Sequence, residues 1–572
     1  MLLNIVFFYI ICFFFLIIIF GYGLLFKKIL NNYFTLNTHE IGFFGFIFIF
    51  LFSNIIHFFF PLNQIIASIF FVGGVILFVK YFNFKEEIKK INYILPIILY
   101  LLVVLTNNFH DDRYWYQLPY INYYQNYKII FGANSLNIFF YNNSIYEIMS
   151  IFNIESLTNS IYYVVPSTII FFVTFFILEE IRVNKSNKLK MLLTFFFVLI
   201  LIRYTRSKEY GADLFTMTFM FLTMYYFFKN LYNVKIENIF KIYSFFIFSI
   251  FSKIYAVFFI LYPFFLLIKE FKTSIELIKK KKIFLFFIIL IFVPILKNYI
   301  QSSCLIYPIQ KLCISNNSWY NGNELIKSLE TSGEAIAKGF KNYIYEKKDF
   351  QLTEESFLDE NKFSFFKYLV LDKDFERILI AIFFFTLTYF IFFREVKFGL
   401  NLKHKKILVI SLLSFIFWLT YLPQSRYGGN IVVLSFISSL FIFFTKTSIF
   451  KLDKISKAFI SLCIVFFVVK NLVRINDQIY YSKMNDIKFP FLEFNDFTAK
   501  EKRINQFKLL VSNNERYCVN SKTLCVTNSI FDSIESITTI NGYIFIKPNK
   551  DSMYEALKIQ NTDHKMTFID YK

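Results

Sequence analysis

Long apolar blocks recur along most of this chain, and they restrict its possible folds more than any other feature. Two examples run from Ile5 to Phe20 and from Ile283 to Leu296, and both are apolar almost throughout. A bilayer core of about 30 Å requires about 20 mostly apolar residues per helix. The whole chain is 56% hydrophobic, against roughly 45–50% in soluble domains. These blocks therefore predict a polytopic α-helical membrane protein.

Fourteen membrane spans are predicted from these blocks. They cover 2–26, 41–61, 65–79, 93–106, 159–178, 191–202, 213–228, 242–252, 255–268, 283–297, 377–393, 407–422, 430–444 and 458–474. The region 242–268 has two interpretations, because it is either a tight hairpin broken near Ser252-Lys253 or one long helix. The first block lacks a basic leader and a small-residue cleavage site, so we interpret it as a retained helix rather than a signal peptide.

Basic residues alternate between the predicted connections. One set carries two to six Lys or Arg in each connection, and it comprises 27–40, 80–92, 179–190, 229–241, 269–282, 394–406 and 445–457. The opposite short connections, together with 107–158, hold only Arg113, Lys128, Arg203, Arg206, Lys208, Lys253 and Arg426. Because Lys and Arg accumulate in cytoplasmic loops, we expect the first set in the cytoplasm. Reading 242–268 as one helix would reverse every later loop.

This orientation places the N-terminus, the long loops 107–158 and 298–376, and the tail 475–572 outside. The net charge of +21 follows from the same loop bias, and no nucleic-acid partner is expected because no basic soluble domain exists to bind one. We predict a transmembrane domain over 1–474 and a small extracytoplasmic α+β domain over 475–572.

The cysteines fit the predicted sides. One pair shares the second long outer loop and another pair shares the tail, whereas Cys12 and Cys463 lie inside spans. Outer compartments permit disulfides. Two short-loop bridges are therefore predicted, with four free thiols as the alternative; the residues are Cys304, Cys313, Cys518 and Cys525.

An acid pair opens the first long outer loop. Asp111 and Asp112 follow the end of a predicted span, at the membrane surface. One carboxylate there could deprotonate an acceptor hydroxyl while the other orients it or shares a cation. The alternative interpretation is a solvated pair of loop acids.

Several cations face outward against the local charge bias. The segment RYTRSKEYGADLF contains Arg203, Arg206, Lys208, Glu209 and Asp213. Guanidinium groups suit bidentate contacts with phosphate, so phosphate binding is one explanation for these charges. The other is a charged helix end neutralised by its own two acids.

Two more basic residues lie at predicted helix junctions on the outer side. Lys253 separates two very apolar segments, and an ionisable residue in such a place is a functional-site hypothesis by default. Snorkelling from a hairpin tip explains it equally and is compatible with that role. Arg426 precedes Gly428 and Gly429, which would allow close approach of backbone or ligand, although a plain turn is the alternative.

Together these groups predict an outward-facing surface site with a carboxylate pair and several cations. Such a site suits a sugar donor linked to a lipid phosphate, since the cations hold the phosphate and a carboxylate activates the acceptor. The chain contains no GxSxG, HExxH, P-loop or CxxC motif that would indicate other chemistry.

Short motifs follow one another in a fixed order along the outward segments. Asp112 precedes Tyr116-Gln117-Leu118-Pro119, and a glycine-containing stretch runs from Lys128 to Asn137. The remaining motifs contain Ala212 and Asp213, then Lys253, then Pro294, Lys297, Asn298, Ser302, Ser303, Tyr307 and Pro308, then Pro423, Arg426 and Gly428, then Cys518 and Cys525. In this order they resemble the GT-C superfamily of integral-membrane glycosyltransferases, and more narrowly a family of bacterial membrane proteins described as glycosyltransferases of that type. Gln117, Ala212 and Ser303 depart from the family's His, Pro and Gly.

The resemblance implies a catalytic acid in the first outer loop and a polyprenyl-phosphate sugar donor. It assigns Asp112 as the base, helped by Asp111, and adds Lys297 and Tyr307 to the expected donor-binding residues. It implies inverting transfer to a glycan or lipid acceptor at the outer face of the bacterial inner membrane. Some GT-C enzymes need a divalent cation and others need none, so a divalent cation and no cofactor are the two alternatives.

Two other functions stay open. A flippase or transporter of lipid-linked glycans would need charges through the bilayer midplane, and most predicted spans lack them. An O-antigen-type polymerase or ligase would use paired arginines in large outer loops rather than an early acid pair.

Overall fold

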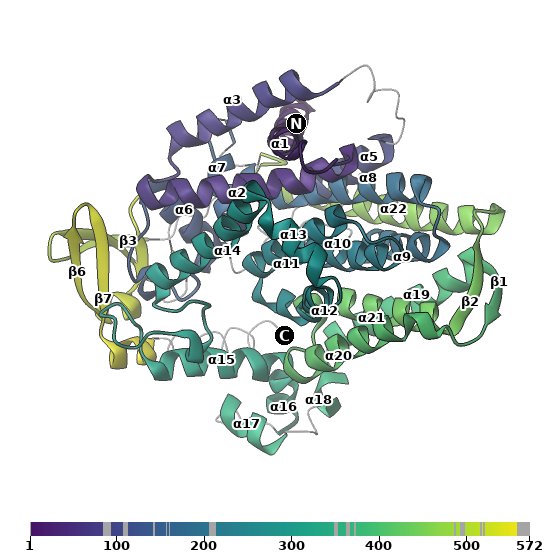
Figure 1. Ribbon diagram of the computed structural model, residues 1–572. Coiled ribbons are helices and arrows are strands. Elements are labelled where there is room, and N and C mark those ends of the chain that lie inside the picture. Colours follow the sequence, from purple (N-terminus) through teal and green to yellow (C-terminus); the bar gives the residue numbers. More distant parts are fainter. Residues whose placement is uncertain are drawn as a thin grey trace.

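The computed structural model describes most of the 572 residues. The described ranges are 2–83, 93–106, 113–140, 144–155, 157–158, 161–204, 213–347, 353–361, 366–370, 373–484, 488–491, 498–514, 517–518 and 521–556. Helices make up most of these ranges, and many of them lie roughly side by side (Figure 1).

Eight helical segments among the described residues are long and apolar enough to cross a membrane. They are α1 (Leu2–Leu30), η1 with α2 (Thr38–Phe59), α3 (Gln64–Tyr81), η5 with α8 (Tyr162–Val183), α14 (Lys281–Ser302), α19 (Phe375–Phe392 within Lys373–Phe392), α21 with the end of η9 (Tyr427–Phe444) and α22 (Lys454–Met484). A ninth is reached if the bent pair Ile254–Lys269 and Phe271–Lys279 counts as one span. The class of polytopic helical membrane protein is therefore confirmed. The number of fourteen spans stays a prediction.

The other predicted spans are also helices, but they are shorter or more polar. They are α5 (Ile94–Leu105), α9 (Asn187–Arg203), α10 (Asp213–Tyr232), α11 (Ile236–Ser252), η6 (Ile254–Phe259) with α12 (Leu261–Lys269), and α20 (Lys405–Tyr421). Helix α10 shows the reason. It is almost wholly buried among other helices, so it can carry threonines, an Asp and a Lys that a lipid-facing helix would avoid.

The chain reverses at Lys253. Helix α11 ends at Ser252, and Lys253 has an extended backbone (φ −155°, ψ 133°). After the turn, Ser274 in α13 (Phe271–Lys279) lies beside Tyr243 of α11, with 3.2 Å between their hydroxyl oxygens. The ring of Phe240, near the start of α11, contacts Phe287 near the start of α14 at 5.7 Å. The region 242–268 is thus a hairpin and not one long helix.

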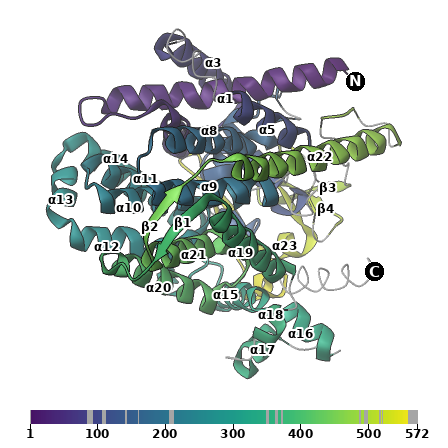
Figure 2. The same ribbon diagram turned by 90° about the vertical axis from the view of Figure 1, so that its right-hand side faces the viewer.

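Connections that are predicted to share the cytoplasm meet at one end of the bundle. Strand β1 (Phe393–Phe398) pairs antiparallel with β2 (Thr445–Phe450) and joins the connections 394–406 and 445–457. Figure 1 shows this ribbon at one end of the helices, and Figure 2 views the molecule from that end. Ion pairs Glu40–Lys241 and Glu180–Lys229 join three more basic connections. Lys188 also donates to the Thr445 carbonyl, so five of the seven basic connections are joined in the described part of the chain.

Strands of the C-terminal region form two small sheets. The first has the order β3 (Ala499–Ile504), β4 (Phe507–Ser512), β5 (Cys525–Thr527), with β3–β4 antiparallel and β4–β5 parallel. The second is the antiparallel hairpin β6 (Ile534–Ile540) and β7 (Tyr543–Pro548), and α23 (Asn528–Asp532) lies between the sheets in sequence. Helix α22 continues to Met484, past the predicted domain boundary at 474.

The long segments that are predicted to lie outside consist mostly of short helices in their described parts. The first contains η3 (Arg113–Gln117), α6 (Leu118–Asn126), η4 (Ala133–Ser135) and α7 (Ser144–Phe152). The second contains η7 (Gln310–Leu312), α15 (Asn323–Ala337), α16 (Phe340–Lys347), α17 (Glu354–Glu360) and α18 (Phe366–Val370). Two further short turns are η8 (Leu402–His404) and η9 (Ser425–Gly429). Helices α16 to α18 have a small apolar core of their own around Phe357.

Candidate functional site

Four segments that are far apart in sequence meet at the end of α10 and α11 opposite the β1–β2 ribbon. The Lys253 ammonium donates to Asp213 Oδ1 at 2.5 Å. Next to Lys253, Ser252 shares a hydrogen bond of 2.7 Å with Ser144, the first residue of α7. The ring of Tyr255 contacts Tyr427 of η9, with centroids 6.1 Å apart. We call this place the Asp213–Lys253 site.

The ion pair is formed by two helix ends. Asp213 is the first residue of α10, where the positive end of the helix dipole favours a carboxylate. Lys253 follows the last residue of α11 and is held in extended backbone. About a third of each side chain is exposed, 32% for Lys253 and 34% for Asp213. The pair can therefore be reached by a ligand from outside the protein.

Polar groups continue beneath this pair. Tyr255, two residues after Lys253, is only 2% exposed. Asn430 donates from Nδ2 to the Tyr204 hydroxyl at 3.2 Å. The Asn430 Oδ1 atom is buried and has no hydrogen-bond partner in the described part of the chain. A buried acceptor of this kind usually has a partner, either a water molecule or a ligand.

Gly428 allows η9 to approach the site closely. It has φ of +76°, in the left-handed region that side chains disfavour. A Cβ atom at this position would lie 2.9 Å from the Met220 Cε and 3.1 Å from the Tyr255 ring. The glycine motif that follows Arg426 is thus a packing requirement of the site.

The predicted residues fall into separate groups. Asp213 and Lys253 are in contact, η9, which contains Arg426, packs against α10 and η6, and Arg203 ends α9 one residue before Tyr204. Asp111, Asp112, Arg206, Lys208, Glu209 and the side chain of Arg426 lie outside the described residues. Their roles stay predictions.

Lys297 lies elsewhere, in a closed pair. Its ammonium is fully buried and hydrogen-bonded to Glu147 of α7, and Asn54 Nδ2 donates to the second oxygen of that carboxylate at 2.6 Å. The Lys297 ammonium also lies 4.4 Å from the centre of the Tyr124 ring. Burial raises the pKa of Glu147 to about 7, although Lys297 opposes this shift. The pair fastens α7 to α14 and presents no surface to a donor phosphate.

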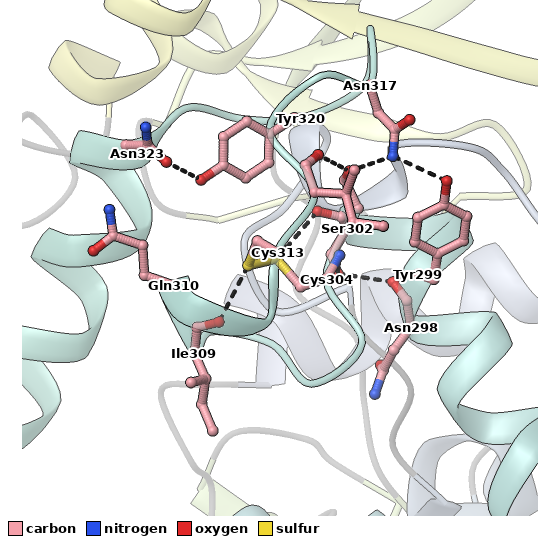
Figure 3. Close-up of a disulfide and its surroundings, with 12 residues drawn as sticks. Asn298, Tyr299, Ser302, Cys304, Ile309, Gln310, Cys313, Asn317, Tyr320 and Asn323 are labelled. Atoms are coloured by element: carbon pink, nitrogen blue, oxygen red, sulfur yellow. Dashed lines mark hydrogen bonds between the residues drawn. A yellow bond between two sulfur atoms is a disulfide. The ribbon is translucent and has the colours of Figure 1, made fainter.

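Tyr307 and the first cysteine pair belong to a compact turn after α14. Cys304 and Cys313 are disulfide-bonded, as are Cys518 and Cys525 in the tail. Tyr307 is buried against Cys304 and Tyr320. Figure 3 shows this turn, in which Asn317 Nδ2 donates to the Tyr299 hydroxyl at 3.1 Å. Tyr307 therefore contributes packing here.

A charge network at the opposite end was not anticipated from the sequence. His39 contacts Glu180 at 3.1 Å, and Lys229 contacts the same carboxylate at 2.9 Å. Lys241 donates to Glu40 at 2.6 Å, with both side chains buried. The only signal was acids beside apolar blocks, and the sequence does not show that they converge.

This network also contains a group with metal-ligand geometry. Ligand atoms of His39, Glu40 and Glu180 lie within 4.8 Å of one another, and no second group of this kind occurs among the described residues. However, Lys241 and Lys229 already neutralise both carboxylates. The arrangement is that of an ion-pair network that closes the helix ends.

The fold and this site define a polytopic helical protein with a polar, partly exposed ion pair at one end of its bundle. Residues 1–433 match the family described as Domain of unknown function (DUF8201), and the chain belongs to that family. No curated protein and no solved structure matches the chain. The family match ends within α21, so α22 and the strands of the tail lie beyond it.

Proposed function

We propose that this protein is a GT-C-type glycosyltransferase that spans the bacterial inner membrane fourteen times. It transfers a sugar from a polyprenyl-phosphate donor to a glycan or lipid acceptor at the outer face. The observation that carries the proposal is the contact between Asp213 and Lys253, 40 residues apart in sequence. Both lie in segments that resemble motifs of the bacterial glycosyltransferase-like family, and both lie at the end of the bundle opposite the β1–β2 ribbon.

The exposed ion pair supports a role for Lys253 in holding the donor phosphate. An ammonium with a third of its side chain exposed can exchange its carboxylate partner for a phosphate oxygen. Asn430 Oδ1 and the Tyr255 hydroxyl are buried polar groups without a hydrogen-bond partner among the described residues, and we propose that they orient the sugar or phosphate. Arg203, Arg206, Lys208 and Arg426 are the further candidates for the phosphate charge.

The proposed reaction needs one base and one anion site. A carboxylate of Asp112, helped by Asp111, takes the proton of the acceptor hydroxyl. The acceptor oxygen then bonds to the anomeric carbon from the face opposite the phosphate. The bond from that carbon to the phosphate oxygen breaks, and polyprenyl phosphate leaves with the electron pair. Attack from the opposite face inverts the anomeric configuration.

The test is transfer from a polyprenyl-phosphate sugar in membranes that contain the full chain. Asp112→Asn and Lys253→Met should each lower transfer at least tenfold. Lys327→Met is the matched control, because this lysine forms an exposed pair with Glu355 on the separate helices α15 and α17. Unchanged turnover in both Asp112→Asn and Asp111→Asn would refute the base. Assays with and without a chelator measure divalent-cation dependence, since carboxylates are the ligands that Mg²⁺ prefers.

A further inference from the structure

The tail hairpin is joined to the first outer loop through backbone hydrogen bonds. The Phe131 amide donates to the Ile544 carbonyl at 2.9 Å, and the Ile546 amide donates to the Phe131 carbonyl at 3.0 Å. Phe131 thereby pairs with Phe545 of β7 in parallel register. Their rings stack at 4.2 Å. The loop residue extends the sheet edge, which is how an added strand binds.

The turn between β6 and β7 also contacts the first outer loop, at Lys128. The Lys128 ammonium lies 3.9 Å from the centre of the Tyr543 ring, and the Tyr543 hydroxyl donates to the Phe58 carbonyl at 3.2 Å. Gly542 turns with φ of +73°. A Cβ atom there would lie 3.1 Å from the Lys128 ammonium nitrogen.

The rest of the tail contacts both ends of the loop. The Cys518 amide donates to the carbonyl of Tyr114 at 3.1 Å. At the far end, Lys522 pairs with Glu155 at 3.0 Å. Tyr114 is two residues from the predicted base, Asp112, in sequence. The tail thus bridges the start, middle and end of the segment that carries the acid pair.

We infer that the C-terminal region 498–556 is a positioning element for the first outer loop. Strand β7 holds the segment around Phe131, and the backbone hydrogen bond from Cys518 holds the segment around Tyr114. This part of the inference concerns structure alone. Its consequence for turnover rests on the proposed function, because it requires that the loop carries the base.

Amide hydrogen exchange of the full chain in lipid nanodiscs tests the inference. The double variant Tyr543→Ala/Phe545→Ala removes the ring contacts to Lys128 and Phe131. Exchange in peptides covering 118–136 should then be at least tenfold faster, while α10 and α11 stay protected. Ile540→Ala is the matched control, because this β6 side chain is 54% exposed, and it should leave the loop unchanged.

Exchange in 118–136 that stays as slow as in the parent protein, while β6 and β7 themselves exchange faster, would overturn the inference. If the double variant loses protection throughout, Gly542→Ala replaces it. This variant disturbs only the turn over Lys128, and the same comparison between the loop and α10 applies.

Turnover distinguishes this inference from the proposed function. In active preparations, the hairpin variant should lower kcat with little change in KM for the donor. Asp112→Asn should lower kcat without changing exchange in the loop. A parent protein without transfer activity would refute the proposed function and leave the exchange result standing.

Discussion

Two lysines of the predicted donor-binding set lie in opposite environments. Lys253 and Asp213 are each about a third exposed, whereas Lys297 and Glu147 are fully buried. Exposed ion pairs contribute only about 0–1 kcal/mol to folding. Loss of one partner from a buried pair costs about 3–5 kcal/mol. The same change of charge should therefore alter function at one site and stability at the other.

Substitution of Lys253 should reduce activity without unfolding the protein. Lys253→Met is expected to lower kcat/KM for the donor roughly 10- to 100-fold, the equivalent of one charge-assisted hydrogen bond of about 1.5–3 kcal/mol. The thermal midpoint should match that of the parent, as should that of Asp213→Asn. Turnover and thermal unfolding in detergent measure the two effects. A large drop in midpoint for both variants would show that the pair is structural.

The buried pair should show strong coupling. Glu147→Leu and Lys297→Met should each destabilise the protein by about 3–5 kcal/mol, because each leaves an unpaired buried group. The double variant should lose less than either single variant, since two apolar side chains of similar size replace the pair. Unfolding free energies of all four proteins give the coupling. Additive losses would contradict a direct interaction.

At the scale of elements, the hairpin at Lys253 decides the side of everything that follows. In the sequence, this turn is indicated by one polar residue, Lys253, between two apolar segments. Whether that residue ends a helix depends on contacts of α11 with α13 and α14, which come from up to 50 residues away in sequence. The hydropathy of 242–268 alone is equally compatible with a hairpin and with one long helix.

Cysteine labelling tests the hairpin in the membrane. Val234→Cys and Lys272→Cys should react with an impermeant maleimide from the cytoplasmic side, and Lys253→Cys from the outer side. Both Val234 and Lys272 are exposed, and they flank the hairpin. If 234 and 272 react from opposite sides, the region crosses the membrane once. Background labelling should be low because Cys12 and Cys463 are buried and the other cysteines are bonded.

At the scale of the whole molecule, different kinds of residues gather at the two ends of the helix bundle. The basic connections joined by hydrogen bonds and ion pairs, the β1–β2 ribbon and the network of Glu40 and Glu180 lie at one end. The Asp213–Lys253 site, both disulfides and the tail sheets lie at the other. Basic loops at one end and disulfides at the other are what the proposed orientation in a bacterial inner membrane predicts.

Thiol chemistry tests this division. In protein purified from membranes, Cys304, Cys313, Cys518 and Cys525 should react with maleimide only after reduction, and Cys12 and Cys463 only after unfolding. Cys304→Ser should free a single reactive thiol, at Cys313, which mass spectrometry of labelled peptides identifies. Reaction of all four without reductant would place these segments in a reducing compartment.

Helix positions and their order were predictable because hydropathy is a local property of 12 to 30 residues. The residues of the site could be predicted from the sequence only in part. Lys253 and Asp213 were named separately, but Lys297 shows that a charge in a motif can equally be a buried structural partner. The Phe131–Phe545 pairing had no sequence signal at all, because a sheet register joins backbone groups that are 414 residues apart.

The sequence by itself determined that the chain forms many apolar helices and that their connections alternate in charge, and it predicted which residues carry chemistry. Burial of apolar surface and the cost of moving charge across a bilayer act on each segment separately, so composition suffices. The tertiary structure alone decided that α11 turns back at Lys253, that Asp213 reaches it, and that the tail holds the first outer loop. Those outcomes depend on packing between distant segments, which no single stretch of residues specifies.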